Sequence, residues 1–80
     1  MKVRVLFFAS LRERTGLRER TLEIPDGSSV DTLMSTLHRE YPVLAKCGRV
    51  SIAVNEDYAK PDEILEDGDE VALIPPVSGG

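Results

Sequence analysis

The sequence predicts an α+β fold in which a mixed sheet packs against one main helix. Three observations carry this prediction: strand-like alternation near both ends of the chain, one amphipathic stretch between them, and a last strand that can lie beside the first. The chain has 80 residues, of which 41% are hydrophobic and 30% are charged. This composition is typical of one small folded domain and excludes a disordered chain.

The first part of the chain predicts two strands joined by a short helical turn. Residues 2–8 alternate in polarity and become apolar on both faces, which indicates a central strand. Residues 9–16 contain helix formers and stop at a glycine, and alternation resumes over residues 20–24. Pro25-Asp26-Gly27 then ends the second strand with strong turn chemistry.

The main helix is expected to begin after the N-cap candidates Ser28 and Ser29 and to end near Pro42. Its apolar residues fall on one stripe at helical spacing; they are Val30, Leu33, Met34, Leu37 and Tyr41. The stripe predicts that the helix packs across one face of the sheet.

Two further strands are expected over residues 50–54 and 70–74, the second entered through the turn Asp67-Gly68-Asp69. A right-handed crossover would place this last strand parallel to the first, in the middle of the sheet. We therefore expect one domain over residues 1–75 and a flexible C-terminal tail over residues 76–80 that leaves the end of a central strand.

Charge disfavours several classes of partner. The net charge is −4, and eight carboxylates lie between Glu56 and Glu70 against Lys60 alone. Such a face repels nucleic acid and anionic lipid and can steer a basic protein partner. The arginines at positions 12, 14, 18 and 20 are interspersed with glutamates and lack nearby aromatic residues for stacking, so partner contacts or solvation are expected there.

Other residues give little sign of catalysis. Cys47, the single cysteine, agrees with a reducing compartment and is expected to be a packing residue, while His38 is expected at the surface. No metal site is expected, because no second ligand candidate stands at useful spacing from His38. With no membrane span and a strand-like N-terminus, the expected location is the cytoplasm.

The C-terminal tail is the most informative segment. Pro75-Pro76 follow the last strand directly, and Gly79-Gly80 lack a Cβ, so the last peptide units can thread a narrow channel. A carboxylate is a poor acyl donor and needs activation by another protein. The pattern therefore predicts a chain that presents its own carboxyl terminus.

Several motifs along the chain resemble the MoaD family, the small sulfur-carrier subunits of molybdopterin synthase. The resemblance covers nearly the whole chain in order, and its most specific part is the ending; the motifs are Phe8-Ala9-Ser10-Leu11-Arg12-Glu13, Gly16, Val54-Asn55, Leu65-Glu66-Asp67-Gly68-Asp69-Glu70-Val71-Ala72 and Ile74-Pro75-Pro76-Val77-Ser78-Gly79-Gly80. This resemblance implies a ubiquitin-like β-grasp fold within the wider MoaD/ThiS family.

The resemblance also implies a chemical cycle. An activating enzyme of the MoeB type would use ATP to adenylate the carboxylate of Gly80, and sulfur would replace AMP to give a thiocarboxylate. The tail would then insert into a MoaE-like large subunit, within a heterotetramer, and donate sulfur to cyclic pyranopterin monophosphate to form the molybdopterin dithiolene. The chain would be an enzyme only as this sulfur-donating subunit, with no cofactor bound to it.

The residues expected to contact the partner are those of the tail and two residues of the sheet; they are Pro75, Pro76, Val77, Ser78, Gly79, Phe7 and Leu73. Apolar strand residues are more often core than interface, and sequence alone does not divide Phe7, Phe8, Leu11 and Leu73 between the two. Two other functions remain open: a ThiS-like sulfur carrier for thiamine thiazole, tRNA or cysteine, and a ubiquitin-like modifier joined to lysines through Gly80.

Overall fold

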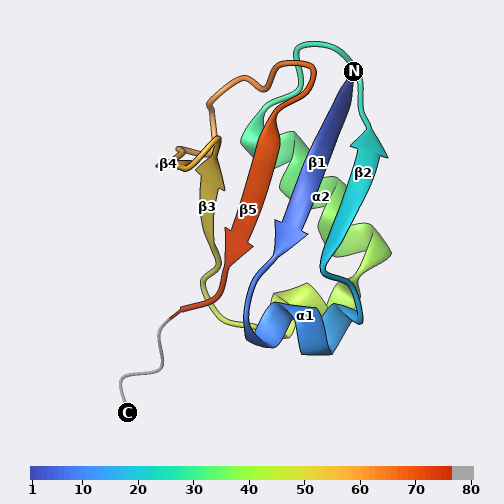
Figure 1. The fold of residues 1–80 in the computed structure, drawn as a ribbon, viewed down its shortest axis with the longest axis vertical. Helices are drawn as coiled ribbons and strands as arrows, with labels where there is room; N and C mark the ends of the chain where they lie inside the picture. Colours follow the sequence, from blue (N-terminus) through green and yellow to red (C-terminus); the bar gives the residue numbers. More distant parts are fainter. Residues whose placement is uncertain (77–80) are drawn as a thin grey trace.

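The computed structural model describes residues 1–76 and confirms the predicted α+β architecture (Figure 1). The elements follow one another as β1 (Lys2–Phe7), α1 (Ser10–Thr15), β2 (Glu19–Glu23), α2 (Val30–Glu40), the 3₁₀ helix η1 (Pro42–Lys46), β3 (Ser51–Val54), β4 (Asp57–Tyr58) and β5 (Glu70–Ile74). Sequence reasoning did not anticipate η1 or the two-residue strand β4.

The five strands form one mixed sheet in the order β2-β1-β5-β3-β4. Strand β5 lies parallel to β1, with partners from Arg4↔Glu70 to Phe7↔Leu73, and every other neighbouring pair is antiparallel. The predicted parallel pairing of the last strand with the first, in the middle of the sheet, is therefore confirmed. Because β1 and β5 run in the same direction, both end at the same end of the sheet (Figure 1).

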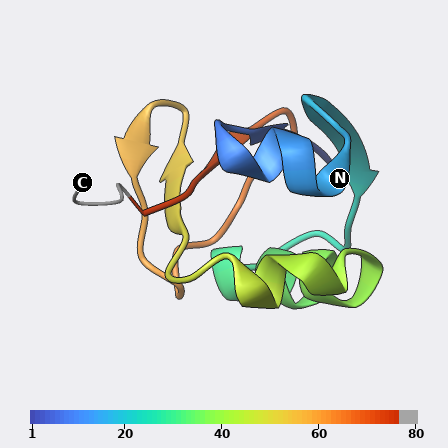
Figure 2. The same cartoon turned by 90° about the horizontal axis from the view of Figure 1, so that it is seen from below.

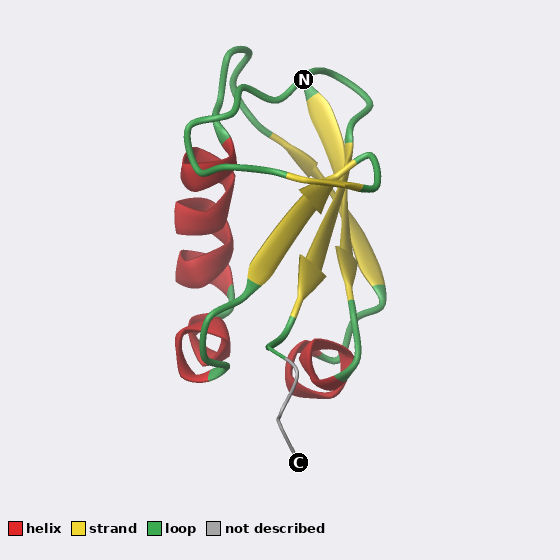
Figure 3. Ribbon diagram, turned by 90° about the vertical axis from the view of Figure 1, so that its left-hand side faces the viewer, coloured by secondary structure: helices red, strands yellow, loops and turns green. Residues whose placement is uncertain are grey.

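Helix α2 lies across one face of the sheet, and none of the described helices covers the other face (Figures 2 and 3). Alternate residues of the central strands point toward α2 and are fully buried, among them Val5, Phe7 and Leu73 at 0% exposure. From the helix, Leu33 and Leu37 face them, also at 0% exposure. Burial of this apolar layer is the main term that stabilises the fold.

The ends of α2 follow from the local sequence. Ser29 is extended, and its hydroxyl accepts a hydrogen bond from the Thr32 backbone N–H at 3.2 Å, as an N-cap residue should. Ser28 donates instead to the Pro25 carbonyl at 2.6 Å, so it closes the preceding turn. Because Pro42 lacks an N–H and cannot continue the α-helix, the chain passes into η1 at that residue.

Candidate functional site

The candidate site is the end of the sheet at which β1 and β5 both finish, called here the exit end. The same end carries α1, η1 and the segments that lead into β2 and β3 (Figure 1). The opposite end carries the start of β1, the first turn of α2 and the loop before β5. The described chain leaves the exit end through Pro75 and Pro76.

The base of the tail packs against Gly48. A Cβ built on Gly48 would lie 3.3 Å from Pro76 Cγ, closer than most carbon contacts in proteins, and the φ of Gly48 is +77°. Glycine therefore satisfies two demands here, a left-handed backbone and the close approach of a proline ring. No sequence pattern predicted this role of Gly48, because it depends on a contact with a residue far along the chain.

Four residues of the tail, Val77 to Gly80, lie outside the described residues. The roles assigned to Val77, Ser78, Gly79 and Gly80 therefore stay predictions. The described part of the tail agrees with an ordered base: Pro75 is half-buried and Pro76 is exposed. Proline also ends the strand ladder, because it has no N–H to donate.

Phe7 and Leu73 are core residues, which corrects their assignment to the partner surface. Both side chains have 0% exposure on the α2 side of the sheet, and Phe7 meets Tyr41 edge to face with ring centroids 5.9 Å apart. Leu11, at 0% exposure, also belongs to the core. Successive side chains of a strand point to opposite faces of the sheet, so the strand neighbours of these buried residues face outward.

The outer face of the sheet carries the apolar residues that remain accessible. Leu6 and Ala72 are register partners in β1 and β5 and are half-buried, as is Ile74. Phe8 continues the outward parity beyond β1 and is 39% exposed. These four residues define what we call the outer apolar patch, and it runs toward the exit end.

Arg12 and Phe8 form a fixed unit at the end of this patch. The Arg12 Nε donates to the Phe7 carbonyl at 3.0 Å, and the Arg12 guanidinium carbon lies 5.9 Å from the Phe8 ring centroid. This geometry is that of a cation–π contact. Beside it is a hollow of about 280 Å³, lined by Leu6, Phe7, Phe8, Arg12, Arg18 and Glu19.

The acidic D-G-D-E motif is structural. Asp67 accepts a hydrogen bond from the Lys2 N–H at 2.7 Å, and Gly68 N–H donates to the Lys2 carbonyl at 2.7 Å. The Asn55 amide donates to Asp69 at 2.9 Å and accepts from the Glu70 N–H at 3.0 Å. These bonds tie the entry of β5 to β1 and to the β3–β4 turn, at the end opposite the tail.

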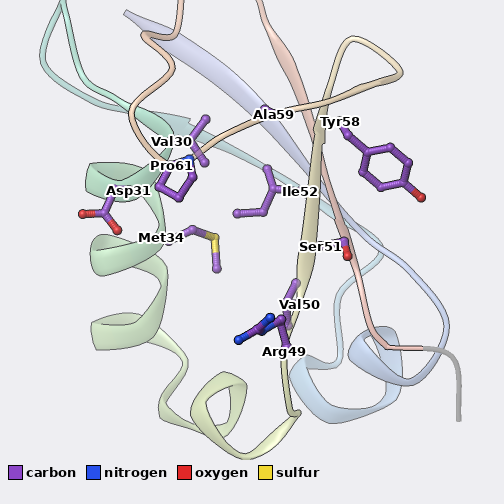
Figure 4. Close-up of a pocket in the computed structure, with 10 residues that line it drawn as sticks. All are labelled: Val30, Asp31, Met34, Arg49, Val50, Ser51, Ile52, Tyr58, Ala59 and Pro61. Atoms are coloured by element: carbon purple, nitrogen blue, oxygen red, sulfur yellow. The ribbon is translucent and has the colours of Figure 1, made fainter.

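A larger hollow, of about 380 Å³, separates α2 from β3 (Figure 4). Its wall is mainly apolar, with Val30, Met34 and Ile52 facing one another and Arg49 near one mouth. Its lining residues include no cysteine and no histidine.

The remaining polar side chains hold the body together. Cys47 is half-buried, and its thiol donates to the Val43 carbonyl at 3.3 Å, in line with the predicted packing role. Arg20 pairs with Glu40 and hydrogen-bonds the Tyr41 hydroxyl at 2.8 Å; these contacts raise the pKa of Arg20, the Tyr41 bond most. Within residues 1–76, no three His, Cys, Asp or Glu residues gather as a metal site.

None of the helices within residues 1–76 has the length and apolar character needed to span a bilayer.

The fold and the exit of the chain from the end of a central strand define the ubiquitin-like β-grasp class. Within that class the chain belongs to the ThiS family, whose model matches residues 5–80. The chain is 43% identical to the molybdopterin synthase sulfur carrier subunit of Mycobacterium tuberculosis, over 100% of this chain and 99% of that protein. It is 41% identical to the protein of the same name from Chlamydomonas reinhardtii, with both chains fully covered.

Solved structures agree with this assignment. A putative molybdopterin converting factor subunit 1 from Pyrococcus furiosus superposes with a TM-score of 0.86 at 34% identity, over 95% of this chain and 98% of that one. Small archaeal modifier protein 1 from Methanosarcina acetivorans gives 0.83 at 31% identity, with 99% and 96% covered. A complex of subunits 1 and 2 of the molybdopterin-converting factor from Helicobacter pylori gives 0.74 at 26% identity, with both chains fully covered.

Proposed function

We propose that this chain is the sulfur carrier subunit of a molybdopterin synthase. The observation that carries the proposal is the match over full length to proteins of that name at 41 to 43% identity. It is supported by the path of the chain, because β5 leads directly into Pro75-Pro76 and the terminal glycines. The names of these relatives favour this reading over a ThiS-like donor for another pathway.

The proposed chemistry takes place on the carboxylate of Gly80. A MoeB-like activating enzyme joins this carboxylate to the AMP of ATP and releases pyrophosphate, and a sulfur nucleophile then displaces AMP. The product is a thiocarboxylate, an anionic sulfur nucleophile at neutral pH that needs no base on this chain. Two loaded carriers per substrate donate the two sulfurs of the molybdopterin dithiolene to cyclic pyranopterin monophosphate.

The body of the chain contributes position. Gly48 receives the ring of Pro76, and two consecutive prolines restrict the backbone where the tail begins. A restricted base loses less conformational freedom when the tail enters a channel, so less binding free energy is spent on ordering it. Groups that bind the pterin and transfer protons are proposed to belong to the large subunit, and ATP is used by the activating enzyme alone.

The outer apolar patch is the proposed contact for the MoaE-like large subunit. It combines one half-exposed aromatic residue with three smaller apolar residues, next to the point where the tail leaves. No helix within residues 1–76 covers that face (Figure 3). We propose a heterotetramer of two carriers and two large subunits, in the reducing cytoplasm, as the resemblance to the MoaD family implies.

Complementation tests this function. A cell that lacks its own carrier subunit and is supplied with this chain should regain molybdenum-cofactor synthesis, measured as the activity of a molybdenum enzyme. The chain should also recover a MoaE-like large subunit in a pull-down. Recovery of a thiazole synthase, together with failed complementation, would point to the ThiS-like alternative.

A second candidate function is protein modification. It is favoured by the similarity to small archaeal modifier protein 1, at 31% identity and a TM-score of 0.83. In this case the activated Gly80 would form an isopeptide bond with a lysine of another protein. Digestion of cellular proteins should then yield lysine peptides that carry a remnant of this tail, whereas the carrier function predicts none.

A further inference from the structure

We propose that the hollow between Arg12 and Arg18 binds a carboxylate side chain of the large subunit that accepts the tail. This inference rests on the proposed function and adds the chemistry by which the partner is recognised. It concerns a contact beside the outer apolar patch, separate from the tail itself.

Arg12 and Arg18 are both among the six residues that line the hollow. Arg12 is held in place by its bond to the Phe7 carbonyl and by its contact with the Phe8 ring. Arg18 lines the same hollow just before β2, and its backbone carbonyl accepts the Phe7 N–H at 2.8 Å. A guanidinium group can donate paired N–H bonds to a carboxylate, so two arginine residues at one hollow favour a carboxylate as its occupant.

Both arginines are available for such a bond. Neither Arg12 nor Arg18 makes an ion pair within residues 1–76, and both are exposed. Glu19 also lines the hollow, but its carboxylate pairs with Arg4 Nε at 3.3 Å. A volume of about 280 Å³ admits one or two side chains and not a separate folded element.

The distribution of charge over the whole fold points to the same occupant. Residues 8–20 and 38–50, which form the exit end, hold seven Lys or Arg against three Asp or Glu, a net charge of +4. By contrast, the net charge is −8 over residues 2–7, 21–37 and 51–74, which hold three Lys or Arg against eleven Asp or Glu. The protein therefore presents its positive end with the tail, and an acidic surface around the partner's channel complements it.

This polarity changes the role expected of the acidic loop. From sequence, the carboxylates between Glu56 and Glu70 were expected to attract a basic partner, but they lie at the opposite end, away from the tail. A polyanion such as nucleic acid would meet a net charge of −8 on the larger part of the fold, so a protein carboxylate beside apolar side chains is favoured. The Leu6 and Phe8 side chains supply the apolar part of the contact.

Binding of the intact chain to the large subunit encoded in the same genome tests the proposal, measured by stopped flow at low and high salt. Arg18→Gln is the main variant, because this exposed side chain makes no hydrogen bond within the described residues and its loss should leave the fold intact. Arg14→Gln is the matched control: it removes the same charge from the same end but does not line the hollow. Melting curves of both variants verify folding.

We expect Arg18→Gln to weaken binding about fivefold and to reduce its salt dependence, against less than twofold for Arg14→Gln. Arg18→Lys should recover part of the loss. In a charge swap, Arg18→Glu should be rescued by changing one acidic residue of the large subunit to arginine.

If the wild-type complex forms, equal effects of Arg18→Gln and Arg14→Gln, or no effect of either, would overturn the proposal. If the wild-type complex does not form, the proposed function is overturned instead. Competition by single-stranded DNA that Arg18→Gln abolishes would identify a nucleic acid site instead.

Discussion

The two ends of the sheet use their polar residues in different ways. At the opposite end, Asp67, Asp69 and Asn55 are bonded to backbone groups and to one another, so the acidic motif fixes where β5 begins. At the exit end, Arg12 and Arg18 line a hollow and make no ion pair with any residue from 1 to 76, and Pro76 packs against Gly48. Hydrogen bonds at the first end fix the entry of β5, whereas the second end carries the contacts that we propose for the partner.

This difference separates stability from function along one strand. β5 starts in a network of hydrogen bonds and finishes at the base of the tail, seven residues apart in sequence from Asp69 to Pro76. Substitutions at the start of β5 should therefore lower mainly the free energy of unfolding. Substitutions at its end should lower mainly the rate of sulfur transfer. The following predictions test that separation.

Removal of Gly80 should give the largest effect, a complete loss of sulfur transfer, because the reacting carbonyl would then belong to a different residue. The melting temperature should stay nearly unchanged, since a chain terminus contributes few buried contacts. A transfer assay with the large subunit and a thermal melt measure the two quantities. Addition of one alanine after Gly80 is the matched variant, and transfer at the normal rate by either protein would contradict the separation.

Leu37→Ala should have the converse effect. Its side chain has 0% exposure between α2 and the sheet, so its truncation should lower the free energy of unfolding by about 2 to 5 kcal/mol. Urea denaturation measures this loss. Ser35→Ala, on the exposed side of the same helix, should change the free energy by less than about 0.5 kcal/mol.

Below its melting temperature, the Leu37→Ala protein should still transfer sulfur at close to the normal rate. A loss of transfer in protein that is verified to be folded would show that the core and the tail are coupled.

Asn55→Gly should test the opposite end. The substitution removes the two hydrogen bonds of the Asn55 side chain to Asp69 and Glu70, while glycine accepts the φ of +50° at this position. We expect a loss of about 1 to 2 kcal/mol in unfolding free energy. Hydrogen exchange should locate the loss at the start of β5, and a reduced rate of sulfur transfer by the folded variant would go against the comparison.

Gly48→Ala should give a small loss of stability and a selective loss of function. The φ of +77° strains any residue with a Cβ by about 1 kcal/mol, and the new methyl group would press on Pro76. Gly16→Ala is the control, because Gly16 has nearly the same φ, +78°, and nothing within 4 Å of the added Cβ. The two variants should unfold at similar urea concentrations, but only Gly48→Ala should slow sulfur transfer.

Much of the fold was predictable because its signals are local. Alternation in residues 2–8 and 70–74, the stripe that contains Leu33 and Leu37, and the N-cap Ser29 each report on neighbouring residues. Their agreement selected the parallel pairing of β1 with β5. The helix η1 was missed because Pro42 reads as the end of a helix, and a 3₁₀ turn after it has no strong sequence pattern.

The candidate site was predictable only in part. The tail could be recognised from the sequence because its residues are contiguous. Gly48 and Pro76 are neighbours in the fold but lie 28 residues apart in sequence, and no sequence pattern relates them. The strand alternation indicated two faces for β1 and β5, but it did not say which face the helix covers. That is why Phe7 and Leu73 were assigned to the partner and the outward neighbours Leu6 and Ala72 were not.

Mass spectrometry of the C-terminal peptide tests the central claim most directly. The intact chain would be incubated with an activating enzyme, ATP and a sulfur source, and then digested. The account predicts that one oxygen of the Gly80 carboxylate is exchanged for sulfur and that Cys47 is unchanged. Sulfur found on Cys47, with an unmodified Gly80 under conditions in which the activating enzyme is active, would contradict it.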